Sequence, residues 1–394
     1  MARRGKDSVL TEITNKNCPV DKKSDLRRVV YVYSDDLIAV CDQLPKVQCR
    51  ARMVHSLISA YDLSRCMRCV SPRPAREDEV TLFHSSDYVD CLKRLSAIED
   101  DEKYDEEAEE FGLSYDCPAY PGVFEHACVL AGATMTAATC LMSDLCDVAV
   151  NWCGGWHHAK RHEASGFCYF NDIVLGILKL RQKYERVLYV DLDLHHGDGV
   201  EDAFCATNKV MTVSFHKYSP GFFPGTGRLT DTGMGTGRYY SVNVPLKDGI
   251  TDAQFVSVFT RVMELARVSY APGVLVCQCG ADGLTGDPME AFNLTPSAHS
   301  QCLQYLLSWN IPLLLVGGGG YNFANTARCW TVLTSVVTGQ QLRSEIPEHE
   351  AFTEYGPDFE LELQAGNKIN RNTNEYIEGI LQQVKENLSH VSCG

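Results

Sequence analysis

The sequence has no apolar run close to the roughly 20 residues that a membrane-spanning helix requires. Met1 to Asp25 are polar and contain no apolar core, so the N-terminus does not have the composition of a secretory signal. Internal repeats and long low-complexity linkers are also missing. These absences argue against a membrane, secreted or repeat protein. We expect residues 1–27 to form a disordered polar leader and residues 28–390 to form one soluble globular domain.

Basic residues are scarce, because 36 Lys and Arg stand against 51 Asp and Glu and the net charge is −15. An acidic protein repels nucleic-acid phosphates and suits a basic partner, so no direct nucleic-acid binding is expected. Residues 99–110 contain nine acids and one lysine. We expect this segment to be a solvated or mobile loop, and the alternative is a site that attracts basic peptides.

Disulfides are not expected, although the chain has 18 cysteines. Without a secretory signal, these residues are interpreted as reduced thiols. Cys66 and Cys69 form a CxxC pair, but no second pair follows nearby, so a zinc ribbon is not indicated.

Short apolar runs alternate with helix-like segments from about Val29 onward, which is typical of βαβ units and a parallel sheet. The expected strands are Val29–Tyr33, Val148–Asn151, Val187–Val190, Val210–Phe215, Val274–Cys279 and Leu313–Val316. The expected helices are Met53–Tyr61, Ser86–Leu95, Phe124–Leu145, Asn171–Lys183, Gln254–Ser269, Thr326–Leu333 and Tyr376–Leu388. Because nothing marks an internal boundary, the sequence predicts a single α/β domain.

Four of the expected strands end in reactive or glycine-rich residues. These strand ends lead into Gly154–His158, Asp191–Gly199, Gly280–Asp282 and Gly317–Tyr321. Ligands of open α/β sheets bind beyond the carboxyl ends of the strands. The four endings therefore predict one site at a single edge of the sheet.

The stretch Asp191–Gly199 is the densest of these endings, with three acids and two histidines. Side chains alternate along a strand, so Asp191, Asp193 and His195 can gather on one side. Burying so many charged groups without a metal or a reaction to serve would be costly. The alternative is a polar loop whose acids cap the next helix.

A metal site is indicated by Asp193, His195 and Asp282, which offer two carboxylates and one imidazole. Three protein ligands leave an open position for water on a catalytic zinc ion. This oxygen-rich set also suits Fe(II) or Mn(II), so the ligand types alone do not fix the metal. Taken alone, Asp282 would be interpreted as a cap on the following turn.

General acid–base catalysis is indicated by the adjacent His157 and His158, because imidazole titrates near neutral pH. Each histidine needs a carboxylate to fix its tautomer, and Asp191 and Asp198 are the candidates. His196 has no functional role that the sequence reveals, and we expect it to be structural.

The glycine-rich segments lack the partners of a phosphate-binding loop. No Lys and Ser or Thr follow Gly317–Gly320, and Gly233–Gly237 misses the dinucleotide-binding spacing. Tyr321 is instead a candidate donor to a developing oxyanion. The glycine-flanked aromatics Phe167 and Phe223 are candidate walls of a narrow apolar channel for a long aliphatic side chain.

Together these motifs resemble the class I zinc-dependent histone deacetylases, and among them most the isozyme eight type. The resemblance covers about residues 28–390. Its most specific motifs lie at residues 154–160, 163–169, 189–199, 220–227 and 317–321. It implies the arginase/deacetylase fold, a parallel sheet of about eight strands with helices on both faces.

The resemblance also implies an activity, metal-dependent hydrolysis of N6-acetyl-lysine in histones and other proteins. Asp193, His195 and Asp282 match the zinc ligands, with Fe2+ as a possible alternative metal. The matching catalytic residues are His157, His158, Asp191, Asp198 and Tyr321. The matching substrate-binding residues are Asp116, Gly166, Phe167, Phe223 and Met289. Two potassium sites are implied, one at Asp191, Asp193, His195, Ser214 and Phe215 and one at Phe204, Thr207, Val210 and Tyr240.

By the same resemblance, the partners are acetylated proteins such as histone tails, in the nucleus and the cytoplasm. The chain ends soon after the domain, so no obligatory corepressor complex is expected. His162 and Gly283–Thr285 depart from the family pattern, which affects fine substrate preference and no metal ligand. Two alternatives remain, namely an acetylpolyamine amidohydrolase or ureohydrolase on the same fold and a non-catalytic acetyl-lysine reader.

Overall fold

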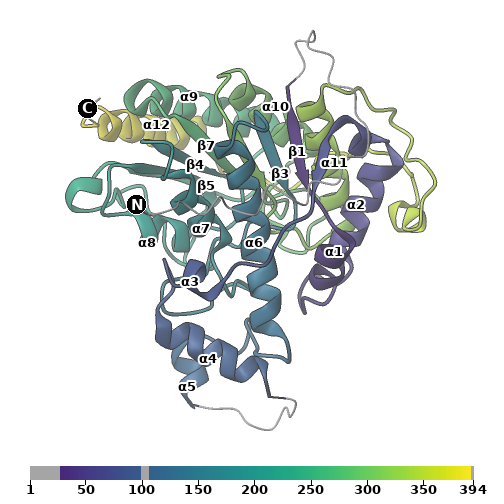
Figure 1. Ribbon diagram of the computed structural model, residues 1–394. Helices are drawn as coiled ribbons and strands as arrows, with labels where there is room; N and C mark the ends of the chain where they lie inside the picture. Colours follow the sequence, from purple (N-terminus) through teal and green to yellow (C-terminus); the bar gives the residue numbers. More distant parts are fainter. Residues whose placement is uncertain (1–26, 99–105, 392–394) are drawn as a thin grey trace.

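The computed structural model describes residues 27–98 and 106–391 and has a parallel sheet of eight strands at its centre (Figure 1). The strand order is β2-β1-β3-β8-β7-β4-β5-β6, and each neighbouring pair is parallel. The strands are β1 (Val29–Val32), β2 (Arg68–Val70), β3 (Val148–Asn151), β4 (Val187–Asp191), β5 (Val210–Lys217), β6 (Ser241–Leu246), β7 (Val274–Gln278) and β8 (Leu313–Val316). The expected α/β class and the expected number of strands are confirmed.

The central strands β3, β8, β7 and β4 are short, apolar and buried along their whole length. A strand covered by helices on both faces needs apolar side chains at both alternating positions, which explains the continuous Val and Leu runs. The six strands expected from these runs are confirmed. The edge strands β2 and β6 were not expected, because β2 has three residues and β6 contains Ser241, Asn243 and Pro245.

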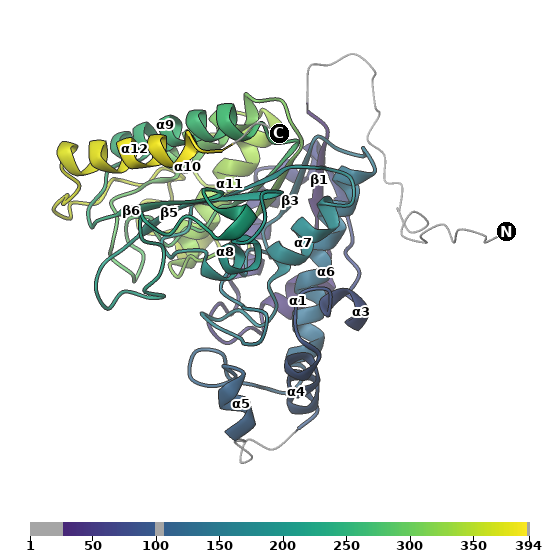
Figure 2. The same ribbon diagram turned by 90° about the vertical axis from the view of Figure 1, so that its left-hand side faces the viewer.

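Helices cover both faces of the sheet and enclose two hydrophobic cores. One core includes residues of α2, α9, α10, α11 and α12, and the other includes residues of α1, α4, α6, α7 and α8. In Figure 2, α9 and α12 lie above the strands and α8 lies below them. The helices are α1 (Asp35–Cys41), α2 (Arg50–Ala60), α3 (Glu77–Val80), α4 (Ser86–Ser96), α5 (Glu106–Glu110), α6 (Val123–Met142), α7 (Asp172–Leu180), α8 (Asp198–Phe204), α9 (Asp252–Tyr270), α10 (Pro296–Leu307), α11 (Phe323–Thr338) and α12 (Asn374–Leu388).

The expected helices correspond to α2, α4, α6, α7, α9, α11 and α12 and are confirmed with shifted ends. Helices α1, α3, α5 and α8 have four to seven residues, too few for a periodic pattern to stand out. Helix α10 had a signal that was missed. Thr295 caps it by accepting the Ser297 N–H at 3.2 Å, and Pro296 occupies the first turn.

Helix α6 corrects the expectation that the chain has no apolar segment of membrane-spanning length. It has 20 residues and is long and apolar enough to cross a membrane, by length and composition alone. Most of its apolar window is buried inside the domain, where it packs against α7 and β3. The burial fits the core helix of a folded domain.

The acidic segment is only partly a loop. Glu106–Glu110 form α5, which corrects the expectation for that part, and residues 99–105 lie outside the described residues. The expected leader also lies outside them, apart from Arg27, which donates a hydrogen bond to the Leu307 carbonyl at 3.1 Å. All sixteen cysteines in the described part of the chain are free thiols.

His84 connects the core under α4 to the start of α7. Its ring lies 4.7 Å from that of Phe83 and 5.0 Å from that of Phe170. Its Nε2 accepts the Asn171 N–H at 3.0 Å. Burial lowers the pKa of His84 to about 3. The folded protein therefore holds a neutral imidazole here.

This burial predicts a loss of stability in mild acid. Below pH 6.5 the unfolded chain binds a proton at His84 that the folded chain excludes until about pH 3. The stability contribution falls by about 1.4 kcal/mol per pH unit in that window as the pH drops. We expect His84→Gln, which keeps an acceptor but does not titrate, to lose about 2 kcal/mol less than the parent chain between pH 7 and pH 5. Urea unfolding at both pH values measures this, and equal losses would contradict it.

Candidate active site

The four reactive strand ends meet at one edge of the sheet, as the sequence predicts. They follow β3, β8, β7 and β4, which are neighbours in the sheet and all parallel. A pocket opens at this edge, here called the catalytic pocket. Its lining includes Gly155, His157, His158, Phe167, Asp193, Gly319 and Tyr321.

Asp193, His195 and Asp282 come together as a buried cluster. Their ligand atoms all lie within 4.8 Å of one another, as one metal ion requires. The Asp282 carboxylate lies 2.8 Å from Nδ1 of His195. Burial and the neighbouring Asp193 raise the pKa of Asp282 to about 7. The negative charge of Asp193 opposes ionisation of Asp282, and a cation between the two carboxylates would relieve this repulsion, so the donor set fits a divalent metal.

Other groups aim the carboxylate of Asp193. Gln278, the last residue of β7, donates from Nε2 to Oδ2 of Asp193 at 2.7 Å, and the Gly319 N–H donates to the same oxygen at 2.8 Å. Gln278 also accepts the Gly280 N–H at 2.7 Å, which fixes its amide orientation. Sequence reasoning missed Gln278, although it lies only two residues before the Gly280–Asp282 strand ending.

The adjacent histidines are both buried, and each has its own carboxylate. His157 Nδ1–H donates to Asp191 at 2.8 Å, and His158 Nδ1–H donates to Asp198 at 2.7 Å. The two Nε2 atoms are 3.0 Å apart. The predicted pairing of the histidines with Asp191 and Asp198 is what the structure contains.

The two histidines differ in their affinity for a proton. Burial opposes protonation of His157, but Asp191 and Asp193 outweigh it and raise the pKa of His157 to about 9. Burial and the charge of His157 lower the pKa of His158 to about 4. The surroundings therefore favour the protonated form of His157 and the neutral form of His158.

The loop that carries the histidines is held at the start of α7. Asp172 accepts the N–H groups of Gly155 at 3.0 Å and Trp156 at 2.8 Å. Asn171 donates to the His157 carbonyl at 3.2 Å. Asn-Asp pairs before an apolar helix are common as caps, so the sequence carried no signal for these contacts.

Tyr321 closes the catalytic pocket. Its ring lies 5.9 Å from that of Phe167, and its backbone N–H donates to Asp287 at 2.8 Å. Arg50 fixes the glycine loop before it, donating to the carbonyls of Gly318 at 2.9 Å and Gly320 at 3.0 Å. Burial raises the pKa of Tyr321 well above its usual value, so its hydroxyl stays a donor.

Phe167 lines the catalytic pocket and Phe223 lies against His158, and their role as channel walls stays a prediction. The Phe223 ring lies 4.9 Å from that of His158 and is 42% exposed, so it borders the opening. Asp116 accepts the Gly166 N–H at 2.9 Å, which places its carboxylate beside this opening. Met289 is half-buried and does not line the catalytic pocket.

The two predicted potassium sites stay predictions, and the structure places their residues in two groups. Asp191 and Ser214 are register partners on β4 and β5, and Phe215 follows on β5. Phe204 ends α8 and accepts the Thr207 N–H at 3.0 Å. Val210 begins β5, and Tyr240 immediately precedes β6.

His196 faces away from the metal cluster. Its Nδ1 lies 2.7 Å from the Thr226 hydroxyl and its Nε2 lies 3.3 Å from the Glu201 carboxylate. Its ring lies 4.6 Å from that of His216. It therefore connects the motif to the loop after β5 and to α8, in line with a structural role.

A histone deacetylase domain model matches residues 44–337. The chain belongs to the histone deacetylase family. Histone deacetylase 8 of Danio rerio is 55% identical over 379 residues, 96% of this chain and 100% of that protein. Histone deacetylase 8 of Xenopus tropicalis is 53% identical over 363 residues, 92% of this chain and 98% of the relative. Human histone deacetylase 1 is 44% identical over 364 residues, 92% of this chain and 75% of the relative. As a family member, this histone deacetylase homologue is a lysine deacetylase, a hydrolase.

The contacts of Gln278 predict a specific defect in metal binding. Gln278→Leu removes the donor to Asp193 and leaves the buried Gly280 N–H without its acceptor. Loss of a partner that orients a ligand typically weakens metal affinity about 10–100-fold. We expect that loss for zinc in competition with a chelator, whereas the exposed Gln304→Leu should bind zinc as the parent chain does. Unchanged affinity in Gln278→Leu would contradict this positioning role.

Proposed function

We propose that this histone deacetylase homologue hydrolyses N6-acetyl-lysine in proteins, including histone tails, and releases acetate. The observation that carries the proposal is the pair of buried histidines, each hydrogen-bonded to its own carboxylate, beside a buried three-ligand cluster and Tyr321. Nucleus and cytoplasm are the proposed locations, and the enzyme is proposed to act without an obligatory corepressor complex.

Asp193, His195 and Asp282 would hold the metal, with zinc as the proposed ion and Fe2+ as the alternative. When bound, the ion polarises the amide carbonyl and makes water more acidic. Potassium is proposed at the two groups around Ser214 and Thr207. Within the described residues, a single cluster has three ligands close enough for one ion, which does not favour a two-metal ureohydrolase.

The chain's own residues supply the proton transfers. His158 Nε2 has no proton when Nδ1–H is bound to Asp198, so it can take a proton from the attacking water. It can then give that proton to the departing lysine amine. His157, held cationic by Asp191, stabilises negative charge that develops nearby.

Substrate binding uses the channel. Phe167 and Phe223 would pack against the lysine methylenes and exclude water from them. Asp116 would accept hydrogen bonds from the substrate backbone at the opening. The Tyr321 hydroxyl would donate to the oxyanion as the amide becomes tetrahedral.

Removing the Tyr321 hydroxyl tests the oxyanion role. Loss of one such donor costs about 3 kcal/mol of transition-state stabilisation, so we expect kcat of Tyr321→Phe to fall about 100-fold or more on an acetyl-lysine peptide. Zinc content should be unchanged, because the hydroxyl is not a ligand. Tyr305→Phe, far away on α10, should keep the parent turnover. Parent-like turnover in Tyr321→Phe would refute the role.

A substrate panel separates the proposal from its alternatives. We expect turnover of acetyl-lysine peptides to exceed that of acetylated polyamines, because Asp116 at the opening suits a peptide backbone. Preference for the polyamine would indicate an acetylpolyamine amidohydrolase. Binding of the peptide without cleavage by zinc-loaded protein would indicate a reader. Release of acetate, measured for each substrate, decides among the three.

A further inference from the structure

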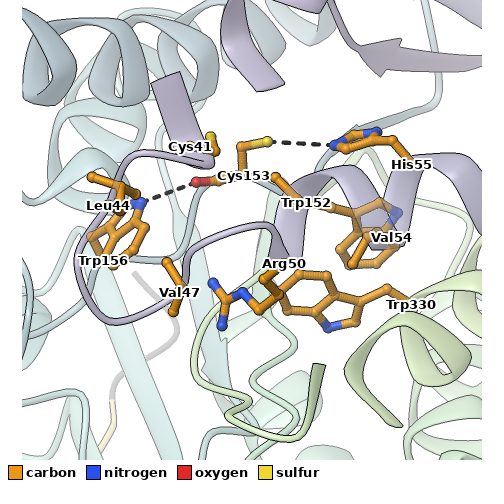
Figure 3. Close-up of a pocket in the computed structure, with 11 residues that line it drawn as sticks. Cys41, Leu44, Val47, Arg50, Val54, His55, Trp152, Cys153, Trp156 and Trp330 are labelled. Carbon is orange, nitrogen blue, oxygen red and sulfur yellow. Dashed lines mark hydrogen bonds between the residues drawn. The ribbon is translucent and has the colours of Figure 1, made fainter. Parts of the chain in front are cut away.

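Behind the catalytic pocket lies a second, smaller cavity, here called the inner cavity (Figure 3). Its lining includes Cys41, Arg50, His55, Cys153 and Trp330. Arg50 also lines the catalytic pocket, as do Val47 and Trp156, so the two spaces are neighbours. The proposed deacetylation uses neither the two cysteines nor His55.

Two buried thiols lie at one end of the inner cavity. Cys41 is the last residue of α1 and Cys153 lies two residues after β3, and both line this cavity. They are 4% and 5% exposed, and Figure 3 draws both side chains at the same end of the cavity. Residues 112 positions apart in the chain thus bring their thiols to the same place, and each thiol shifts the pKa of the other.

His55 and Arg50 make this pair chemically unusual. His55 Nε2 lies 3.4 Å from Sγ of Cys153, and its Nδ1 is hydrogen-bonded to the Tyr31 hydroxyl. Arg50 is 4% exposed and lines the same cavity. The neighbouring Cys41 thiol lowers the pKa of Cys153 against the effect of burial, and His55 and Arg50 act in the same direction. Thiolate character is what makes a cysteine react with oxidants.

A second buried cysteine pair provides the contrast. Cys277 and Cys279 have sulfur atoms 3.8 Å apart. Their hydrogen bond and burial raise the pKa of Cys277 well above its usual value, and no basic side chain contributes. Proximity of two thiols is therefore common to both pairs, whereas the imidazole and the guanidinium belong to the inner cavity.

We propose that Cys41 and Cys153 form a peroxide-reactive dithiol, in which Cys153 is oxidised first and Cys41 resolves it to a disulfide. The Cys153 sulfur attacks one oxygen of hydrogen peroxide; an S–O bond forms, the O–O bond breaks, and the departing hydroxide takes the proton that Cys153 gave up. The Cys41 sulfur then attacks the sulfenic acid; the S–S bond forms, the S–O bond breaks, and the second hydroxide takes the Cys41 proton. Two thiols are oxidised to one disulfide, and one peroxide is reduced to two waters.

The bond would act on the catalytic loop. Cys153 directly precedes Gly154–His158, and its carbonyl accepts the Trp156 indole N–H at 3.0 Å (Figure 3). A disulfide to α1 would fix the start of this loop and remove the thiolate beside Arg50. Turnover by the oxidised protein should therefore fall, an effect that rests on the proposed function.

The chemical test uses the full-length, zinc-loaded protein and increasing hydrogen peroxide. Non-reducing peptide mass spectrometry should detect the Cys41–Cys153 cross-link at lower peroxide than any oxidation of Cys277 or Cys279, and dithiothreitol should reverse it. Cys41 and Cys153 staying reduced, or oxidising no sooner than the control pair, would overturn the proposal. This readout needs no enzymatic activity.

Two variants assign the roles. In Cys41→Ser, dimedone should trap a sulfenic acid at Cys153 because no resolving thiol remains. In Cys153→Ser, no adduct should form at Cys41. Thermal unfolding measures whether each variant is folded. If a variant does not fold, the cross-link measurement on the parent chain still tests the proposal. A cross-link without any deacetylase turnover would reject the proposed function alone.

A turnover assay measures the effect of the disulfide on catalysis. The ratio of acetyl-peptide turnover before and after peroxide should fall severalfold in the parent chain and recover with dithiothreitol. The same ratio should stay near one in Cys41→Ser if a short peroxide exposure is used. An equal loss in both proteins would show that the inner cavity does not control the loop.

Discussion

Burial of carboxylates at the carboxyl edge of the sheet is the constraint on which the rest of the structure depends. Asp191, Asp193, Asp198 and Asp282 are each no more than 2% exposed. A charged group at that depth is costly unless donors or a cation surround it. The donors to these four residues include Tyr189, His157, Gln278, Gly319, His158 and Leu194. These donors and carboxylates come together only when the strands of the sheet are paired, so the site forms as the sheet folds.

The same electrostatics divides the work between two histidines that are adjacent in the chain. His157 lies against Asp191 and close to Asp193, with its Nε2 3.9 Å from the latter, and so it holds a proton. His158 has a single carboxylate, Asp198, and faces the cation that His157 has become. The pKa values of the two imidazoles thus shift in opposite directions because different charged groups surround them. Such a difference can separate the acid role from the base role within a small site.

The sequence predicted the central strands and the clustering of the reactive strand ends correctly, because each follows from a single local rule. Continuous apolar runs marked the central strands, and the rule that parallel strands share a carboxyl edge placed His158, Asp193, Asp282 and Tyr321 in one site. Sequence reasoning missed residues whose role depends on a contact with a residue far away in the chain. Arg50 supports a carbonyl 268 positions away and Gln278 a carboxylate 85 positions away. No periodicity encodes such pairs. Strand β2 was missed because it has three residues and is mostly exposed, and β6 was missed because Ser241, Asn243 and Pro245 interrupt its apolar pattern.

Arg50 links the two buried spaces, because it lines both of them and its guanidinium holds the glycine loop before Tyr321. Carboxylates and thiols respond differently to such a position. A carboxylate above its pKa is negatively charged and loses that charge only by protonation. The buried carboxylates at the catalytic edge are therefore stabilised by fixed hydrogen-bond donors and would be stabilised further by a cation. A thiol can keep its proton, share it with a second thiol or form a covalent bond. Under the proposal, the charge in the inner cavity would therefore change when the two thiols are oxidised, whereas the carboxylates at the catalytic edge are held by fixed donors.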